Sequence, residues 1–306
     1  MSKVDCLVRQ SINPFLWTHT SDIIRDQRRA ALFRGFVVFI QPEARFSAAA
    51  MGQAKPGFGH RHPDEQRAKL VQGVFSQAVD IELADTSDRR DNACSLINKR
   101  YAWRGYGSHH ALPSHRASAT FTASAQSEVL GTVTLVVDSD VGLAADKIFS
   151  EELDAFRNAD GRKICELSRL AFETSLPSKP LLAALFHIVF IYGYHHHRCT
   201  DLFIEVNPRH RRFYEAMLGF KPIGAPRTNE SVAAPSQLMW LEIASIRPRI
   251  EMAAVNATSD KAQRSLYSLF FSRDDALELA EELTSDEAIQ RTMDGNALIK
   301  IYLTDL

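Results

Sequence analysis

The stretches that decide the fold are Lys163–Phe172, KICELSRLAF, and Asp201–Phe220, DLFIEVNPRHRRFYEAMLGF. The first alternates as a strand does, and the β-prone start of the second, Asp201–Val206, predicts another strand. An Asn-Pro turn follows it. A short helix is then predicted over Arg209–Leu218, and Gly219 supplies its C-terminal stop. Two strands and a helix that returns from the second one therefore form the centre of the fold.

The neighbouring segments add a hairpin and several helices. Leu181–His197 is apolar nearly all round, which predicts a buried helix, and Pro180 suits its first turn. Two β-prone runs, Phe121–Ala125 and Gly131–Val137, stand at hairpin spacing. This order of elements predicts an α+β fold with a mixed sheet flanked by helices. Caps and periodicity predict further helices over Leu96–Tyr106, Ile148–Asn158 with Ser150 as N-cap, and Ser272–Leu283, and strands over Leu238–Ile243 and Ala297–Leu303.

Composition argues against several classes of protein. Of the 306 residues, 45% are hydrophobic and 24% are charged, as in ordinary globular chains. Lys and Arg number 36 against 37 Asp and Glu, so the net charge of −1 gives no support for nucleic-acid binding. The four cysteines show no CxxC pair. With no run of about 20 apolar residues and no signal-peptide pattern, we expect a cytoplasmic protein without a transmembrane segment.

A Phe-Tyr pair precedes Leu-Gly-Phe after the Asn-Pro turn of Val206–Phe220. This segment resembles the C-terminal half of the GNAT acyltransferase fold, whose corresponding helix packs beside the pantetheine arm of the acyl donor. The resemblance implies that Tyr214 faces the thioester sulfur, where a phenol O–H assists a departing thiolate. Phe213 and Phe220 are predicted to be core residues, and the same packing role is the alternative for Tyr214.

The strand Lys163–Phe172 carries a Glu-x-Ser-Arg element. In a regular strand Glu166 and Ser168 share one face, and Arg169 points to the other. The element is similar to one on the fourth strand of acyl-homoserine lactone synthases, which implies that Glu166 is the base for the acceptor amine and that Arg169 organises charge nearby. A base is needed because an α-amine is mostly ammonium at neutral pH. A buried structural ion pair is the alternative for Glu166.

Weaker motifs extend in order over about Ala93–Ile243. They are Tyr101-x-x-Arg104-Gly105-Tyr106, Gly131–Leu135 with Asp138 and Gly142-Leu143, Cys199–Asp201 leading into Glu205–His210, and Val232–Leu238. Together they resemble the long-chain N-acyl amino acid synthases of the FeeM type. The resemblance implies transfer of a fatty acyl chain from acyl carrier protein to the amine of an amino-acid acceptor. It also implies substrate contacts by Leu170, Ala171, Phe172, Asn207, Arg104 and Tyr106, with backbone N–H groups near Leu170–Phe172 polarising the thioester carbonyl.

Two departures bear on product and donor. Acyl-homoserine lactone synthases have an arginine where this chain has Thr134, and Ala93–Arg116 lacks their Asp-x-x-Asp pair, which counts against a lactone product. The Gly-rich loop that binds coenzyme A pyrophosphate is replaced by Glu173–Pro180, ETSLPSKP. A donor tethered to acyl carrier protein has no such pyrophosphate, so the sequence favours the carrier protein over coenzyme A. An autoinducer synthase and a non-catalytic acyl-binding regulatory module stay open as alternatives.

Three parts of the chain differ in pattern. Residues 1–88 are predicted to be an N-terminal extension with a partly disordered linker, because Phe46–Gln66 has little periodicity. Residues 89–250 are predicted to be the catalytic domain, and residues 251–306 a C-terminal helical extension. In the first part, Ile23–Ile40 combines arginines with apolar residues, which indicates either a weak contact with a membrane surface or a half-buried helix and strand.

Basic residues near both ends of the predicted buried helix are candidates for docking an acidic carrier protein. A solvated helix face is the alternative for each of them. The helix itself, Leu181–Tyr194, can line a channel for the acyl chain, where each buried methylene contributes about 0.8 kcal/mol, or can simply be core. The candidate docking residues are Lys179, Arg198, Arg209, Arg211 and Arg212.

We expect no metal and no permanently bound cofactor; the donor itself carries the phosphopantetheine thioester. The run His195–His197 stands at a predicted helix end, where consecutive imidazoles point in different directions. Ser168 has no His-Asp pattern around it. We therefore expect direct transfer to the amine without an acyl-enzyme.

Overall fold

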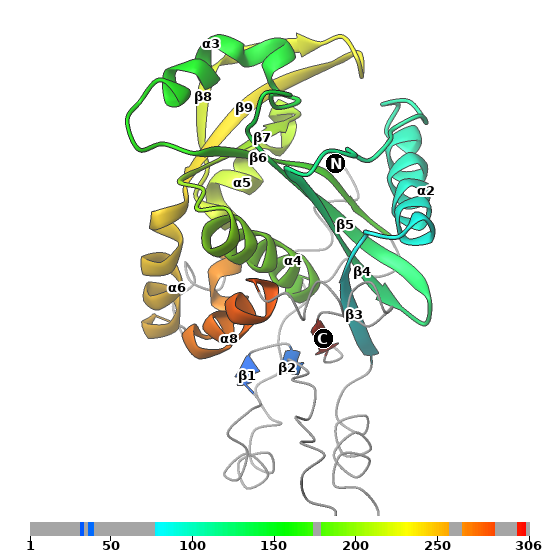
Figure 1. Ribbon diagram of the computed structural model, residues 1–306, viewed down its shortest axis with the longest axis vertical. Coiled ribbons are helices and arrows are strands. Elements are labelled where there is room, and N and C mark those ends of the chain that lie inside the picture. The colour runs from blue at the N-terminus through cyan, green and yellow to red at the C-terminus, as the bar shows by residue number, and fades with distance from the viewer. Residues whose placement is uncertain are drawn as a thin grey trace, which may run out of the picture.

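The computed structural model describes residues 31–33, 36–39, 77–173, 179–256, 265–284 and 299–303, and these form a ten-stranded sheet (Figure 1). The strand order is β1-β2-β10-β3-β4-β5-β6-β7-β9-β8. Strands β6 and β7 run parallel, and the other neighbours run antiparallel. The predicted mixed sheet is confirmed. The strands are β1 Ala31–Phe33, β2 Phe36–Phe39, β3 Gln77–Leu83, β4 Ser118–Ala125, β5 Glu128–Val137, β6 Ile164–Phe172, β7 Asp201–Val206, β8 Lys221–Asn229, β9 Ala234–Glu242 and β10 Ile299–Leu303.

Helices cover both faces of this sheet (Figure 1). Side-chain alternation along β5 shows the division: Leu135 and Val137 pack in the cluster that contains α4, whereas Val136 packs in the cluster of α3. Helix α2 packs on β5 and β6. The α-helices are α2 Ser87–Trp103, α3 Asp146–Arg157, α4 Lys179–Ile191, α5 Arg211–Leu218, α6 Ile246–Val255 and α8 Arg273–Thr284. Short helices are the π-helix η1 Tyr192–His196 and the 3₁₀ turns η2 Pro208–His210, η3 Ile243–Ser245 and η4 Leu266–Leu269.

Most predicted elements are confirmed, but α2 begins at Ser87 instead of Leu96, α6 was not predicted, and three further elements differ. The buried helix is α4, but its last turn widens into the π-helix η1 before His197. Helix α3 begins at Asp146 instead of after Ser150, and its backbone kinks at Phe149. Strand β8 was not predicted, because Pro and Gly interrupt its sequence KPIGAPRTN, and it lies at the sheet edge where such residues are tolerated.

The two predicted extensions meet at one edge of the sheet. Strand β10, which confirms the strand predicted near the C-terminal end, pairs with both β2 and β3. Both predicted extensions therefore contribute strands to the sheet of the predicted catalytic domain, and the domain bounds stay a prediction. The predicted linker Phe46–Gln66 and most of Ile23–Ile40 lie outside the described residues. Where the structure is described, no helix is both long and apolar enough to cross a membrane.

The C-terminal segment is fastened to α4 by His187. This side chain is buried, and its Nδ1 accepts a hydrogen bond of 2.9 Å from the Phe271 N–H. Its ring stacks on Phe270 and Phe271 at centroid distances of 4.5 and 5.0 Å. Burial lowers the pKa of His187 to about 3, so the ring stays neutral and can accept that bond. His187 therefore has a structural role.

Candidate active site

Strand β6 changes its pairing halfway along its length. Its parallel pairing with β7 extends from Ile164 opposite Asp201 to Leu167 opposite Ile204. Beyond Leu167, β6 continues to Phe172 on β5 alone, and β7 continues to Val206 on β9 alone. Within the described part of the chain, the two strands therefore part at Leu167, and β6 presents an open edge on the side of β7.

A β-bulge at Arg169 marks the point where the strands part. Thr134 lies opposite Ser168 and Thr132 lies opposite Ala171, so two residues of β6 face one of β5. Arg169 adopts a left-handed conformation with φ of 52°. The extra residue resets the side-chain alternation.

The bulge overturns the prediction that Arg169 points away from Glu166. The Arg169 guanidinium donates hydrogen bonds to Ser168 Oγ at 3.1 Å and to the Ala111 carbonyl at 2.9 Å. Its positive charge lowers the pKa of Glu166. Because Ser168 shares a face of the strand with Glu166, the bond from Arg169 to Ser168 places the guanidinium on that side of the sheet too. The prediction failed because it assumed a regular strand.

Glu166 is a buried carboxyl with backbone donors. Only 2% of the residue is exposed, and its Oε2 accepts the Ala145 N–H at 3.2 Å at the start of α3. Burial raises its pKa to about 7; the N–H groups of Ala145 and Ala144 oppose this rise, and the charge of Glu205 adds to it. A carboxyl that titrates near pH 7 is suited to accept a proton at that pH.

Glu205 on β7 is a second carboxyl of this site. It accepts a hydrogen bond of 2.7 Å from Ser236 Oγ, and Asn229 also donates to it. Its charge raises the pKa of both Glu166 and Tyr101. In the sequence, Glu205 was part of a motif but was given no role. Its position near the end of the strand predicted to lie beside that of Glu166 is the signal that could have indicated it.

The end of α2 and the turn after β7 form the other side of the site. Tyr106 Oη accepts hydrogen bonds from Asn207 Nδ2 at 3.5 Å and from Arg209 Nη2 at 3.2 Å. Three predicted residues thus meet, although Arg209 was assigned to carrier docking. Arg104 ends α2, and its charge acts on the phenols of Tyr101 and Tyr214.

Tyr214 lies on α5 with its ring half-buried against the core. The rings of Phe213 and Phe220 contact it edge-on at centroid distances of 5.2 and 6.0 Å. Burial raises the pKa of Tyr214 well above its usual range, so the hydroxyl keeps its proton. The predicted core position of Phe220 is confirmed, whereas Phe213 is 36% exposed and is not a core residue. The exposed side of a short surface helix explains this difference.

The side chains of Leu170 and Phe172 face α4, and Ala171 faces α2. Phe172 packs so closely over β5 that a Cβ on Gly131 would lie 2.8 Å from its ring. On the main chain, the Glu173 N–H donates to the Leu130 carbonyl at 2.8 Å. Because N–H directions alternate along a strand, that of Phe172 points to the open edge. At the bulge, the Arg169 carbonyl accepts a hydrogen bond from Thr132 Oγ1 on β5, so the Leu170 N–H of the same trans peptide points away from β5, to the open edge.

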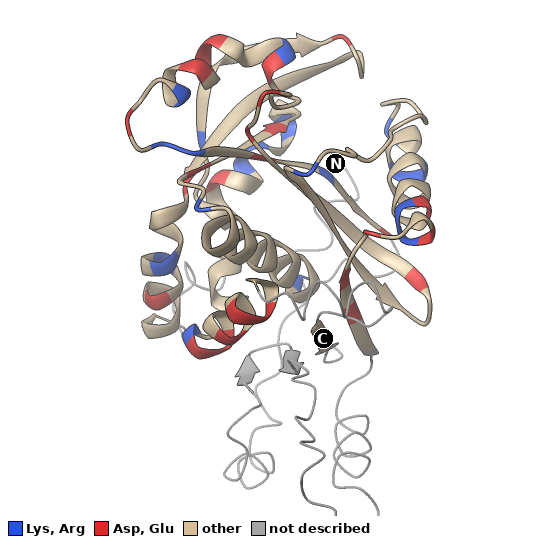
Figure 2. Cartoon of the chain, viewed as in Figure 1, with Lys and Arg blue, Asp and Glu red and all other residues tan. Residues whose placement is uncertain are grey.

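The predicted docking residues do not form one surface. Lys179 begins α4 and Arg198 follows η1, and about 18 helical residues, or about 27 Å, lie between them. Arg211 pairs with Glu215 at 2.6 Å, and Arg212 is exposed beside it. Strand β7, six residues or about 20 Å long, separates Arg198 from the arginines of α5. Figure 2 shows that acidic residues are concentrated along α8.

Among the described residues, no group of three or more His, Cys, Asp or Glu side chains is placed to hold a metal ion. The histidine run His195–His197 is packed against aromatic rings. Tyr192 stacks on His196 at 4.9 Å, and the ring of His197 lies perpendicular to that of His196. The imidazoles therefore face aromatic neighbours and one another's edges.

A mixed sheet with one parallel strand pair that diverges, beside a bulge and a buried carboxyl, defines the class: an acyltransferase of the GNAT fold. Comparison with known proteins agrees. The family described as N-acyl amino acid synthase FeeM matches residues 92–242. This part of the chain belongs to the FeeM family, and the predicted fold, family and acyltransferase activity are confirmed.

Solved structures also match about half of this chain. FeeM from uncultured soil microbes is 27% identical with a TM-score of 0.50, and the match covers 55% of this chain and 94% of that one. The acyl-homoserine lactone synthase LasI is 15% identical with a TM-score of 0.41, covering 54% and 89%. Escherichia coli ElaA is 11% identical with a TM-score of 0.41, covering 54% and 98%. No curated protein sequence matches the chain.

Proposed function

We propose that the chain transfers a long fatty acyl group from acyl carrier protein to the α-amine of an amino acid, giving an N-acyl amino acid. The observation that carries this proposal is the buried carboxyl of Glu166 beside the open half of β6. The FeeM family assignment supports the reaction class. The donor and the acceptor are parts of the proposal.

Glu166 is the general base of the proposed reaction. The acceptor enters as an ammonium ion and gives one proton to Glu166, directly or through a water. The free amine nitrogen then forms a bond to the thioester carbonyl carbon, and the carbon–sulfur bond breaks. The nitrogen loses its second proton as the amide forms, and the thiolate takes up a proton with help from the Tyr214 hydroxyl. One thioester and one ammonium thus become one amide, one thiol and one released proton.

The open edge of β6 stabilises the negative charge that develops on the carbonyl oxygen. The N–H groups of Leu170 and Phe172 point there without a partner strand among the described residues. Fixed backbone donors of this kind supply a large part of the barrier reduction in acyl transfer. Arg169 and Glu205 set the local charge around the base, and Tyr106, Asn207 and Arg104 surround the acceptor.

A donor comparison tests this function. The full chain is incubated with a pool of amino acids and either palmitoyl acyl carrier protein or palmitoyl coenzyme A, and products are identified by mass. We expect an N-palmitoyl amino acid, formed faster from the carrier protein. A lactone product in lipid extracts of cells that express the chain, where other acceptors are available, would establish the autoinducer alternative. No acyl transfer from either donor, by a chain that binds acyl carrier protein, would establish the regulatory module.

Carrier docking is tested by charge reversal at Arg211 and Arg212 on α5. The exposed position of Arg212 and the surface ion pair of Arg211 make folding insensitive to the change. We expect KM for acyl carrier protein to rise, while KM for palmitoyl pantetheine stays unchanged. Charge reversal at Arg198, which lies beyond the far end of α4, is the matched control; an equal effect there would contradict docking on α5.

A further inference from the structure

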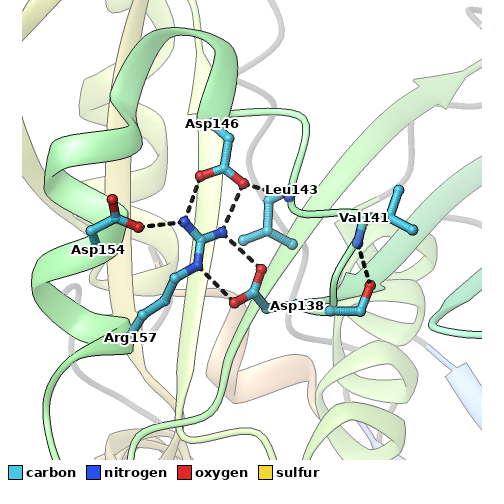
Figure 3. Close-up of polar contacts among 7 residues, drawn as sticks. Asp138, Val141, Leu143, Asp146, Asp154 and Arg157 are labelled. Carbon is cyan, nitrogen blue, oxygen red and sulfur yellow. Dashed lines mark hydrogen bonds and ion pairs between the residues drawn. The ribbon is translucent and has the colours of Figure 1, made fainter.

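Arg157, the last residue of α3, binds three aspartates at once (Figure 3). Its Nε and Nη2 donate to the two oxygens of Asp138 at 2.7 Å each. Its Nη1 and Nη2 donate to the two oxygens of Asp146 at 2.6 and 2.7 Å, and Nη1 also donates to Asp154 at 2.9 Å. A guanidinium has five N–H donors, so this arrangement uses all of them.

These bonds close the loop that joins β5 to α3. Asp138 follows the end of β5 and Asp146 is the first residue of α3, so Arg157 ties the two ends of the loop together. Inside the loop, the Leu143 N–H donates to Asp146 Oδ2 at 2.6 Å. Gly142 has φ of 73°, and a Cβ there would lie 2.8 Å from the same Asp146 oxygen. The loop is therefore built tightly around the Asp146 carboxylate.

The same loop presents its last two N–H groups to Glu166. The Ala145 N–H lies 3.2 Å from Glu166 Oε2, and the Ala144 N–H also hydrogen-bonds to this carboxyl. Ala145 precedes the first turn of α3, where N–H groups have no partner within the helix. Glu166 thus takes the place of a capping side chain, which Ala145 lacks.

We propose that Arg157 is a positioning residue of the acyl transfer, because through Asp138 and Asp146 it holds the loop whose N–H groups fix and stabilise the Glu166 carboxylate. This inference rests on the proposed role of Glu166 as base. It assigns a function to an ion-pair cluster that lies outside the substrate-binding residues and touches none of the predicted catalytic side chains.

The direction of the effect follows from the groups that face Glu166. The N–H groups of Ala144 and Ala145 stabilise its ionised form, as does Arg169, while Glu205 on β7 and burial oppose it. Cys165, its neighbour on β6, is a buried thiol whose own pKa lies well above the usual value, so it stays neutral. Loosening the loop removes the N–H donors but leaves the burial of Glu166 and the charge of Glu205, so the pKa of Glu166 rises.

We call the ion pairs of Arg157 with Asp138 and Asp146 the clamp. Titration of the Glu166 carboxyl tests directly whether this clamp controls the pKa of Glu166. The full chain is labelled with ¹³C at the glutamate carboxyl, the Glu166 signal is assigned from its absence in Glu166→Gln, and its pKa is read by NMR. Two variants loosen the clamp differently: Arg157→Lys keeps the charge but loses the five-bond fork, and Gly142→Ala adds a methyl group against Asp146. We expect each to raise the pKa of Glu166 by about one unit, the effect of losing a hydrogen bond to a charged group.

Matched controls separate positioning from general damage. Arg162→Lys perturbs an arginine bound to Asp201 at 2.9 Å, away from the loop, and Gly161→Ala places a methyl at φ of 72° with no atom within 4 Å. Neither is expected to move the pKa. The rate of amide formation in the two clamp variants should return to wild type at high pH, which a merely structural defect would not allow.

An unchanged or lowered pKa of Glu166 in folded Arg157→Lys and Gly142→Ala would overturn the inference. A lowered value would show that the loop acts by excluding water. Because the titration reads the carboxyl itself, it decides the clamp whether or not amide product forms. A wild-type chain that makes no product would contradict the proposed function alone.

Discussion

The two halves of strand β6 differ in their partners. From Ile164 to Leu167 the strand is paired on both sides and lies regularly in the sheet. From Ser168 to Phe172 it is paired on one side, after a bulge that places Arg169 in a left-handed conformation. The paired half holds the carboxyl of Glu166 in a fixed, buried position, and the open half offers N–H groups that have no partner strand among the described residues. The proposed base and the proposed carbonyl-polarising donors therefore follow each other on one strand.

The largest expected loss of activity follows from removing the carboxylate of Glu166, the proposed base in the paired half of β6. Glu166→Gln keeps an oxygen that can accept the Ala145 N–H, so the fold should persist, but an amide cannot take the ammonium proton. We expect turnover to fall about 10²–10⁴-fold with an unchanged circular dichroism spectrum. The full rate in a folded variant would show that the paired half carries no base.

Tyr214→Phe removes the α5 hydroxyl that is proposed to assist the leaving group. A thiol with a pKa near 8.5 departs as thiolate with little help, so we expect about a tenfold loss of kcat. The pH at which the rate begins to fall should not move, because the phenol stays protonated throughout. A loss as large as that of Glu166→Gln would make Tyr214 the principal proton carrier instead.

The bulge itself is tested by comparing two truncations of Arg169. Both Arg169→Ala and Arg169→Gly remove the guanidinium and should lower activity alike. Only Gly is free of the strain of a positive φ, so the glycine variant should be more stable by about 1 kcal/mol in chemical denaturation. Equal stabilities would indicate that the bulge relaxes when the side chain is lost.

Glu205→Gln tests whether the charge of Glu205 raises the pKa of Glu166 in the paired half of β6. The amide oxygen can still accept from Ser236, and the negative charge that raises the pKa of Glu166 is gone. The pKa of Glu166 should fall, so activity should persist to lower pH than in wild type. A shift to higher pH would contradict the arrangement of the two carboxyls.

Local patterns in the sequence predicted most strands and the buried helix, because these depend on periodicity within a few positions. Glu166 and Tyr214 were singled out by motifs that resemble known families, and their roles stay a prediction. The bulge was not predictable, since KICELSRLAF alternates without a glycine to mark it. Backbone donors such as Ala144 and Ala145 carry no side-chain signal at all. Glu205 and Arg157 gain their roles through partners 24 or more and 11 or more residues away, respectively, once the sheet has assembled.

The pH dependence of amide formation, measured side by side for wild type and Glu166→Gln, tests the central claim most directly. With palmitoyl acyl carrier protein and a saturating amino acid, the wild-type rate should rise about tenfold per pH unit below pH 7 and level off above it, because the base must be ionised. The variant should be slow throughout and lack that break. A variant that keeps the wild-type rate and the same break would contradict the account.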